Sequence, residues 1–316
     1  MTTTPYPAHA TVVEVGMRDG LQSEADVIPL ADKLALTRAL IAAGIRHFEI
    51  SSFVSPRAVP QLADAAELVA ALAGERRNLE LSALVPNPRG AARAAEAGVD
   101  TMVVFVSASE SHNQKNVNRS VADSLDGFRE VCRIAGQHGI PVAGAIATAF
   151  GCPFEGEVPI SRVVDIARSF RDLGMSVLTL GDTTGMATPP LVRERVMALR
   201  EAVPELPISL HFHNTRGIAM ANVLAGLELG VERYESAIGG LGGCPFAPGA
   251  TGNAATEDLV YLLAECGVET GVDLDRLIDA SKLAARTVGH DLPAQVSKAG
   301  PRLARHDLDA VCTAAG

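Results

Sequence analysis

Two histidines one residue apart are the most informative pair in the sequence. His211 and His213 occur in the segment LHFHN (210–214), at the end of an apolar run that favours a strand. Side chains two apart on a strand point to the same face, so both imidazoles converge on one point. A lone histidine is more often a structural residue than a ligand. This spacing at a strand end instead favours a metal site.

A second group of polar residues accompanies two other apolar runs. Arg18 and Asp19 directly follow the run Thr11–Val15, and Glu49 lies inside the run His47–Ile50. A carboxylate in a buried strand needs a partner or a metal to offset its desolvation. A structural ion pair with Arg18 would satisfy Glu49 without catalysis, and Arg-Asp-Gly is also typical of a turn. On these residues alone, both interpretations stay open.

A glycine-rich loop follows the last apolar run. Six of the fifteen residues in 239–253 are glycine, and the loop also holds Cys244 and Asn253. Glycine allows positive φ and close approach of the backbone to a ligand. The loop could be a flexible connection, but the Cys and Asn within it favour a lid or substrate loop.

Two nitrogen and two oxygen donors come from these motifs, namely Asp19, His211, His213 and Asn253. This set suits Mg²⁺ or Mn²⁺, with water or substrate oxygens completing an octahedron. Ligand type alone leaves Zn²⁺ open.

The elements that must position these residues alternate along the chain. Short apolar runs predict eight strands, at 11–15, 47–50, 79–84, 101–106, 142–147, 177–180, 208–212 and 234–238. Amphipathic segments lie between them, and several end in a glycine that suits a helix C-terminus. The pattern predicts an α/β fold, a (β/α)8 TIM barrel with active-site residues at the carboxyl ends of its strands. A doubly wound sheet is the alternative, but it would normally carry a GxGxxG turn after its first strand, which is missing here.

We predict one structural domain in two parts. Residues 1–270 form the catalytic barrel, and 271–316 add a C-terminal helix at Asp273–Val288 and a polar tail. We expect the tail to be partly disordered from His290 onward. The added helix offers a surface for a dimer.

Composition narrows the class of protein. The 316 residues carry 27 Lys+Arg against 37 Asp+Glu, a formal net charge of −10. This argues against nucleic acid or an anionic membrane as partner. There is no apolar run of about 20 residues to span a bilayer and no secretory signal at the start. Five scattered cysteines without CxxC spacing indicate a reducing compartment. We therefore expect a soluble cytoplasmic protein.

The motifs, taken in order, resemble the 3-hydroxy-3-methylglutaryl-CoA lyase family. The similarity spans about residues 11–288 and rests on VEVGMRDGLQSE, FEISSFVSPRAVPQ, NQKNVNRS, GCPFEG, LTLGDTTGMATP, HFHNTRGIAMAN and GGLGGCPFAPGATGNAATEDLVYLL. The RDG and HxH motifs are shared with isopropylmalate and citramalate synthases, whereas the glycine-rich loop is more specific to the lyases. We expect no C-terminal regulatory domain of the kind that many of those synthases carry.

The resemblance implies a role for each matching residue. It implies that a divalent cation is bound by Asp19, His211, His213 and Asn253. It implies catalytic roles for Arg18, Asp19, Glu49, His211 and Cys244, and substrate contacts from Gln22, Ser52, Asn116, Asp182 and Thr183. The chain departs from the family pattern beside these motifs, at Met17, Asn214 and Arg216.

The resemblance also implies an activity: metal-dependent retro-Claisen cleavage of 3-hydroxy-3-methylglutaryl-CoA to acetyl-CoA and acetoacetate. The partner would be an acyl-CoA, and a homo-oligomer, with a dimer favoured, is expected. One enzyme alternative is a lyase for a related 3-hydroxyacyl-CoA, and another is a condensing acyltransferase. A metal hydrolase and a non-enzymatic CoA-binding protein are more distant alternatives.

Overall fold

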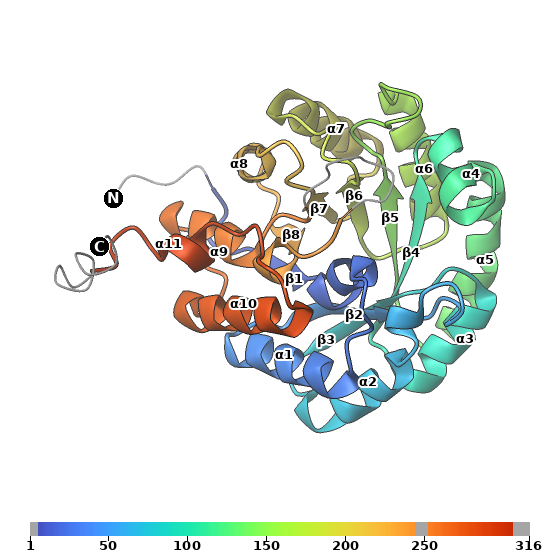
Figure 1. The fold of residues 1–316 in the computed structure, drawn as a ribbon. Coiled ribbons are helices and arrows are strands. Elements are labelled where there is room, and N and C mark those ends of the chain that lie inside the picture. Colours follow the sequence, from blue (N-terminus) through green and yellow to red (C-terminus); the bar gives the residue numbers. More distant parts are fainter. Residues whose placement is uncertain (1–5, 244–251, 306–316) are drawn as a thin grey trace.

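Eight parallel strands close into a barrel in the computed structural model, which describes residues 6–243 and 252–305 (Figure 1). Each strand pairs with the next, and β8 pairs with β1, which confirms the predicted TIM barrel and excludes the doubly wound sheet. The strands are β1 (Thr11–Glu14), β2 (His47–Ser52), β3 (Glu80–Leu84), β4 (Thr101–Ser107), β5 (Val142–Ala147), β6 (Leu178–Asp182), β7 (Ile208–Phe212) and β8 (Arg233–Ser236).

Helices surround the barrel and cover its outer face (Figure 1). They are α1 (Leu30–Ala42), α2 (Ala65–Ala71), α3 (Pro88–Ala97), α4 (Glu110–Val117), α5 (Val121–Gln137), α6 (Ile160–Asp172), α7 (Pro189–Ala202), α8 (Ala219–Glu228), α9 (Thr256–Glu265), α10 (Leu274–Val288) and α11 (Val296–Ala299). None of the helices within the described residues is both long and apolar enough to cross a lipid bilayer.

Helix α6 illustrates how the apolar pattern builds this layer. Its buried residues Val163, Ile166, Ala167 and Phe170 recur at the spacing that lines one face of a helix. A Cβ at Gly144 of β5 would lie only 2.4 Å from the Phe170 ring, so glycine at this position admits the ring against the strand.

Many of the side chains that line the interior of the barrel are small or polar. Residues facing the axial cavity include Ser82, Ala143, Ala145, Thr179 and Gly181. TIM barrels usually fill this space with layers of branched aliphatic side chains. The smaller side chains here leave room along the barrel axis, and the aliphatic residues concentrate between the strands and the helices.

The C-terminal segment packs on the barrel. Helix α10 buries Leu277 and Ala284 among its apolar residues and contacts α1 and α9. Residues 290–305 of the tail pack on the barrel: Leu292 is buried, and the Ala294 N–H donates to the Gly239 carbonyl (3.2 Å). The rest of the tail, for which partial disorder is also expected, lies outside the described residues. The boundary at residue 270 and the dimer surface on α10 stay predictions.

A buried carboxylate ties together the segments that carry the polar motifs. Glu14, at the end of β1, accepts hydrogen bonds from the Gly16 N–H (2.7 Å) and the Ile238 N–H (2.9 Å) through Oε1. Its Oε2 lies 2.7 Å from the Thr256 hydroxyl at the start of α9. Glu14 therefore joins the loop after β1 to both ends of the glycine-rich loop. Burial raises its pKa to about 7.

The raised pKa of Glu14 predicts a pH dependence of stability. The carboxyl ordinarily loses its proton near pH 4.5, but in the folded protein it holds the proton up to about pH 7. Its contribution to stability is therefore full below pH 4.5 and falls as the pH rises towards 7, by about 1.4 kcal/mol per pH unit. Thermal unfolding followed by circular dichroism should give a lower midpoint at pH 7 than at pH 5.

Glu14→Gln, which mimics the protonated acid, should reduce that pH difference. The exposed Glu67→Gln on α2 is the control and should keep it. An unchanged pH difference in Glu14→Gln would contradict the assignment. Glu257, whose pKa burial also raises to about 7, accounts for a remaining part of the difference.

Candidate active site

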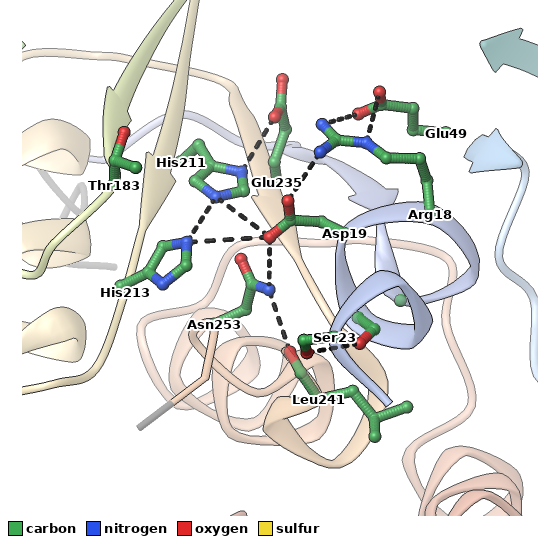
Figure 2. Close-up of polar contacts among 12 residues, drawn as sticks. Arg18, Asp19, Ser23, Glu49, Thr183, His211, His213, Glu235, Leu241 and Asn253 are labelled. Atoms are coloured by element: carbon green, nitrogen blue, oxygen red, sulfur yellow. Dashed lines mark hydrogen bonds and ion pairs between the residues drawn. The ribbon is translucent and has the colours of Figure 1, made fainter. Parts of the chain in front are cut away.

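A tight turn after β1 presents Arg18 and Asp19 to the barrel axis. The Val15 carbonyl accepts hydrogen bonds from the N–H groups of Arg18 (3.0 Å), Asp19 (2.7 Å) and Gly20 (3.2 Å). This single π-helical turn, η1 (Gly16–Gly20), is a local distortion of the kind often found at functional sites. The turn directs both side chains towards the end of β7 (Figure 2).

The two histidines converge as their spacing predicts. His211 lies in β7 and His213 directly follows it, and their Nε2 atoms are 3.2 Å apart. The Asp19 Oδ2 atom faces both rings, 4.0 Å from His211 Nε2 and 3.7 Å from His213 Nε2 (Figure 2). These three side chains form the only group of potential metal-ligating His, Cys, Asp and Glu side chains found in residues 6–243 and 252–305.

Asn253 brings the far end of the glycine-rich loop to the same point. Its Nδ2 donates to Asp19 Oδ2 and to the Leu241 carbonyl, both at 2.9 Å. The neighbouring Ala254 N–H donates to the Phe212 carbonyl (2.8 Å), which joins this segment to β7. Gly242, with φ of +108°, passes so close that a Cβ there would lie 2.6 Å from Asn253 Nδ2.

The residues fit a divalent cation. One ligand atom from each of Asp19, His211 and His213 lies within 4.8 Å of the others. The Oδ1 atom of Asn253 and the Nδ1 atom of His213 are buried without a hydrogen-bond partner among the described residues. A buried, unsatisfied amide oxygen beside this cluster is costly unless a ligand engages it. Carboxylate, amide oxygen and imidazole nitrogen together suit a hard or borderline cation.

Arg18 is held between two carboxylates beside this cluster. Its Nε and Nη2 donate to Glu49 Oε1 (2.7 Å) and Oε2 (2.9 Å), and its Nη1 donates to Asp19 Oδ1 (2.6 Å). The pairing register between β2 and β3 shifts just after Glu49. The side chain of Glu49 is only 3% exposed, so the bidentate ion pair is shielded from water.

Electrostatics differ among the three clustered side chains. Burial opposes charge on Asp19, but Arg18 and the two imidazoles outweigh it and hold the pKa of Asp19 far below its usual range. Burial lowers the pKa of His213 to about 4. Burial also acts against charge on His211, but Glu235 outweighs it and raises the pKa of that imidazole. At neutral pH the cluster thus offers an ionised carboxylate and a neutral His213.

A cavity of about 980 Å³ opens onto this cluster and extends along the barrel axis. Arg18, Asp19, Glu49, His211 and His213 line it. So do three predicted substrate residues, Gln22, Asn116 and Thr183. Its apolar wall includes Val54, Val59, Phe105, Val117 and Phe128.

Two predicted substrate residues do not line this cavity. Ser52 is fully buried, and its Oγ accepts from the Val54 N–H (3.3 Å). Asp182 accepts from the N–H groups of Met186 (2.6 Å) and Ala187 (2.9 Å) through Oδ1, which fixes the turn between β6 and α7. Both side chains accept hydrogen bonds from loop backbone, and their contacts with substrate stay predictions. The predicted Cys244 lies outside the described residues.

Glu235, which lines the cavity, was not among the predicted site residues. Glu235 of β8 lies beside His211, with its Oε2 3.1 Å from His211 Nδ1. The argument that singled out Glu49, a carboxylate inside a predicted buried strand, applies equally to Glu235 in the run 234–238.

Replacing one imidazole should separate metal binding from folding. His213→Ala should weaken binding of Mn²⁺ by about 100-fold or more, because it removes a nitrogen donor from the cluster. Isothermal titration calorimetry with Mn²⁺ measures this directly. The matched control is His47→Ala. It removes an imidazole that contacts Glu80, the first residue of β3, and the variant should bind Mn²⁺ with normal affinity. Unchanged affinity in His213→Ala would remove it from the ligand set.

Comparison with known proteins identifies the family of this chain. The chain matches the HMGL-like family model over residues 9–284. It is 42% identical to the hydroxymethylglutaryl-CoA lyase YngG of Bacillus subtilis, with 92% of this chain and 97% of that protein covered. It is also 42% identical to a 3-hydroxy-3-isohexenylglutaryl-CoA/hydroxymethylglutaryl-CoA lyase of Pseudomonas aeruginosa, covering 93% and 97%.

A solved structure has the same architecture. An HMG-CoA lyase from Acinetobacter baumannii, in complex with coenzyme A and 3-methylmalate, superposes with a TM-score of 0.90. The two chains are 41% identical, and the match covers 98% of this chain and 100% of the other. On the family match, the relatives and the shared architecture, this chain belongs to the HMGL-like family.

Proposed function

We propose that this protein is a carbon–carbon lyase that cleaves 3-hydroxy-3-methylglutaryl-CoA to acetyl-CoA and acetoacetate. The observation that carries the proposal is the position of Arg18 beside Asp19 and the two imidazoles, at the carboxyl ends of the strands and open to one cavity. The names of the relatives support the substrate, and the coenzyme A in the A. baumannii lyase supports an acyl-CoA ligand.

The cofactor in this proposal is a divalent cation held by Asp19, His211, His213 and Asn253. Mg²⁺ or Mn²⁺ matches the oxygen-rich donor set best, and Zn²⁺ is the alternative. When bound, such a cation supplies Lewis-acid polarisation of substrate oxygens.

Cleavage begins with loss of the proton from the C3 hydroxyl of the substrate. The candidate bases are Asp19 and the two histidines, and all three side chains line the cavity. Glu235 outweighs the effect of burial and raises the pKa of His211, whereas the pKa values of Asp19 and His213 are lowered.

The electrons released from the C2–C3 bond move into the thioester carbonyl and form the enolate of acetyl-CoA. Arg18 lines the cavity as a fixed cation that stabilises this oxyanion. Glu49 and Asp19 engage three of its five N–H donors, which orients the guanidinium and leaves two donors for the substrate. Glu49 thus acts through Arg18. Protonation of the enolate carbon by Cys244, or by water near it, stays a prediction.

The acyl chain is the part of the proposal with a specific alternative. The P. aeruginosa relative is named for a substrate with a longer 3-substituent, and the cavity here has an apolar wall that includes Val59 and Phe105. A longer 3-substituted 3-hydroxyglutaryl-CoA is therefore the second candidate. Turnover of 3-hydroxy-3-methylglutaryl-CoA and of such homologues, compared by kcat/KM under Mg²⁺, decides between them.

We expect the protein to act in the cytoplasm as a homodimer. A cytoplasmic location is consistent with free thiols at Cys132, Cys152 and Cys266. A homodimer is proposed from the family resemblance.

Removal of the guanidinium tests the oxyanion role. Arg18→Met should lower kcat at least about 100-fold, corresponding to roughly 3 kcal/mol of lost stabilisation of the transition state. Its affinity for Mn²⁺ should change little, because Arg18 supplies no metal ligand. Acetoacetate formation measures the rate, with the exposed Arg129→Met on α5 as control. A near-normal rate in Arg18→Met would refute the oxyanion role.

A further inference from the structure

Glu235 is not one of the proposed metal ligands, but it contacts His211, which is. It lies on β8 directly opposite His211 of β7 in the strand register. One carboxylate oxygen, Oε2, is 3.1 Å from His211 Nδ1, on the side of the ring away from Asp19 (Figure 2). The opposite ring nitrogen, Nε2, is the one that faces Asp19 and His213.

Hydroxyl groups on β6 and β7 hold the Glu235 carboxylate in place. Its other oxygen, Oε1, accepts hydrogen bonds from the Thr179 hydroxyl on β6 (2.7 Å) and the Ser209 hydroxyl on β7 (3.2 Å). The side chain is 14% exposed and lines the axial cavity. With both oxygens engaged, Glu235 has little freedom to rotate, so its orientation is set before any ligand binds.

This arrangement has a definite consequence for the imidazole. A neutral histidine carries one N–H, and the nitrogen facing a carboxylate must be the one that carries it. A proton on Nδ1 leaves the lone pair on Nε2, directed at Asp19 and His213. His213 has no such support, because its Nδ1 is buried without a hydrogen-bond partner among the described residues.

We propose that Glu235 is a positioning residue that fixes the tautomer and ring orientation of His211, so that Nε2 is presented as a ligand to the metal centre. The inference deepens the proposed function and rests on its metal site, although it concerns a bond that is present in the metal-free protein. Carboxylate partners of this kind typically change metal affinity by about 10- to 100-fold.

Two substitutions distinguish the hydrogen bond from the charge. Glu235→Leu removes the acceptor, and Glu235→Gln keeps an amide oxygen that can accept from Nδ1 but removes the negative charge. We expect the Leu variant to bind Mn²⁺ about 10- to 100-fold more weakly. The Gln variant should lose less than the Leu variant.

The barrel offers a matched control. Glu80 also contacts an imidazole and a threonine, with His47 Nδ1 at 2.7 Å and the Thr101 hydroxyl at 3.0 Å. It heads β3, away from the carboxyl ends of the strands where the cluster lies. Glu80→Leu breaks an equivalent trio and should leave Mn²⁺ affinity unchanged.

The deciding readouts are obtained without substrate. Long-range ¹H–¹⁵N spectra of the metal-free protein, recorded from pH 6 to 9 and assigned with His211→Gln, report which nitrogen of His211 carries the proton. Calorimetry with Mn²⁺ alone reports affinity. The expected result is the Nδ1–H form in the wild-type and Gln proteins, and a shift towards the Nε2–H form with weaker Mn²⁺ binding in the Leu variant.

An unchanged tautomer and affinity in Glu235→Leu would overturn the proposal. So would a loss of affinity in Glu235→Gln as large as that in the Leu variant, since the charge would then be responsible. If the Leu variant does not fold, Glu235→Ala, which leaves room for water beside Thr179 and Ser209, provides the same comparison. Because no measurement uses an acyl-CoA, failure of the proposed lyase activity would be seen separately, in the acetoacetate assay.

Discussion

Charge balance at the carboxyl end of the barrel is the constraint on which the site depends. Asp19, Glu49 and Glu235 place three carboxylates around one guanidinium, Arg18, and these four side chains are mostly shielded from water. Ionised, they carry two uncompensated negative charges, which burial makes costly. Protons relieve part of this excess, as the raised pKa of His211 indicates once the carboxylates outweigh its burial. A divalent cation would balance it fully.

The strands and loops of the barrel hold these like-charged side chains close together. The four charged side chains come from the turn after β1, from β2 and from β8, and Glu14 joins the loops after β1 and β8 through buried hydrogen bonds. Small side chains along the axis leave space for a ligand, so the aliphatic packing that stabilises the fold lies between strands and helices. The net charge of −10 is a sum over the whole chain. An anionic thioester would instead be attracted locally, by Arg18 and a bound cation.

Much of this arrangement can be predicted from the sequence, because strands alternate with helices along the chain and side chains alternate between the two faces of each strand. The eight apolar runs predict the strands, and the spacing of His211 and His213 predicts their convergence. The same two-residue alternation explains the position of Asp182: Gly181 and Thr183 line the cavity, and the residue between them does not. Glu235, like Glu49, is a carboxylate inside a predicted buried strand, so the sequence alone could have identified it. The packing of residues 290–305 could not be predicted in this way, because burial of Leu292 depends on a tertiary surface near Gly239 that no local pattern reveals.

Activity as a function of metal content tests the central claim most directly. The protein would be treated with a chelator, its metal content checked by elemental analysis, and acetoacetate formation from 3-hydroxy-3-methylglutaryl-CoA measured while Mg²⁺ or Mn²⁺ is restored. The account predicts no turnover without metal and full recovery at about one bound ion per chain, in keeping with the single ligand cluster among the described residues. Undiminished turnover by verified metal-free protein would contradict it.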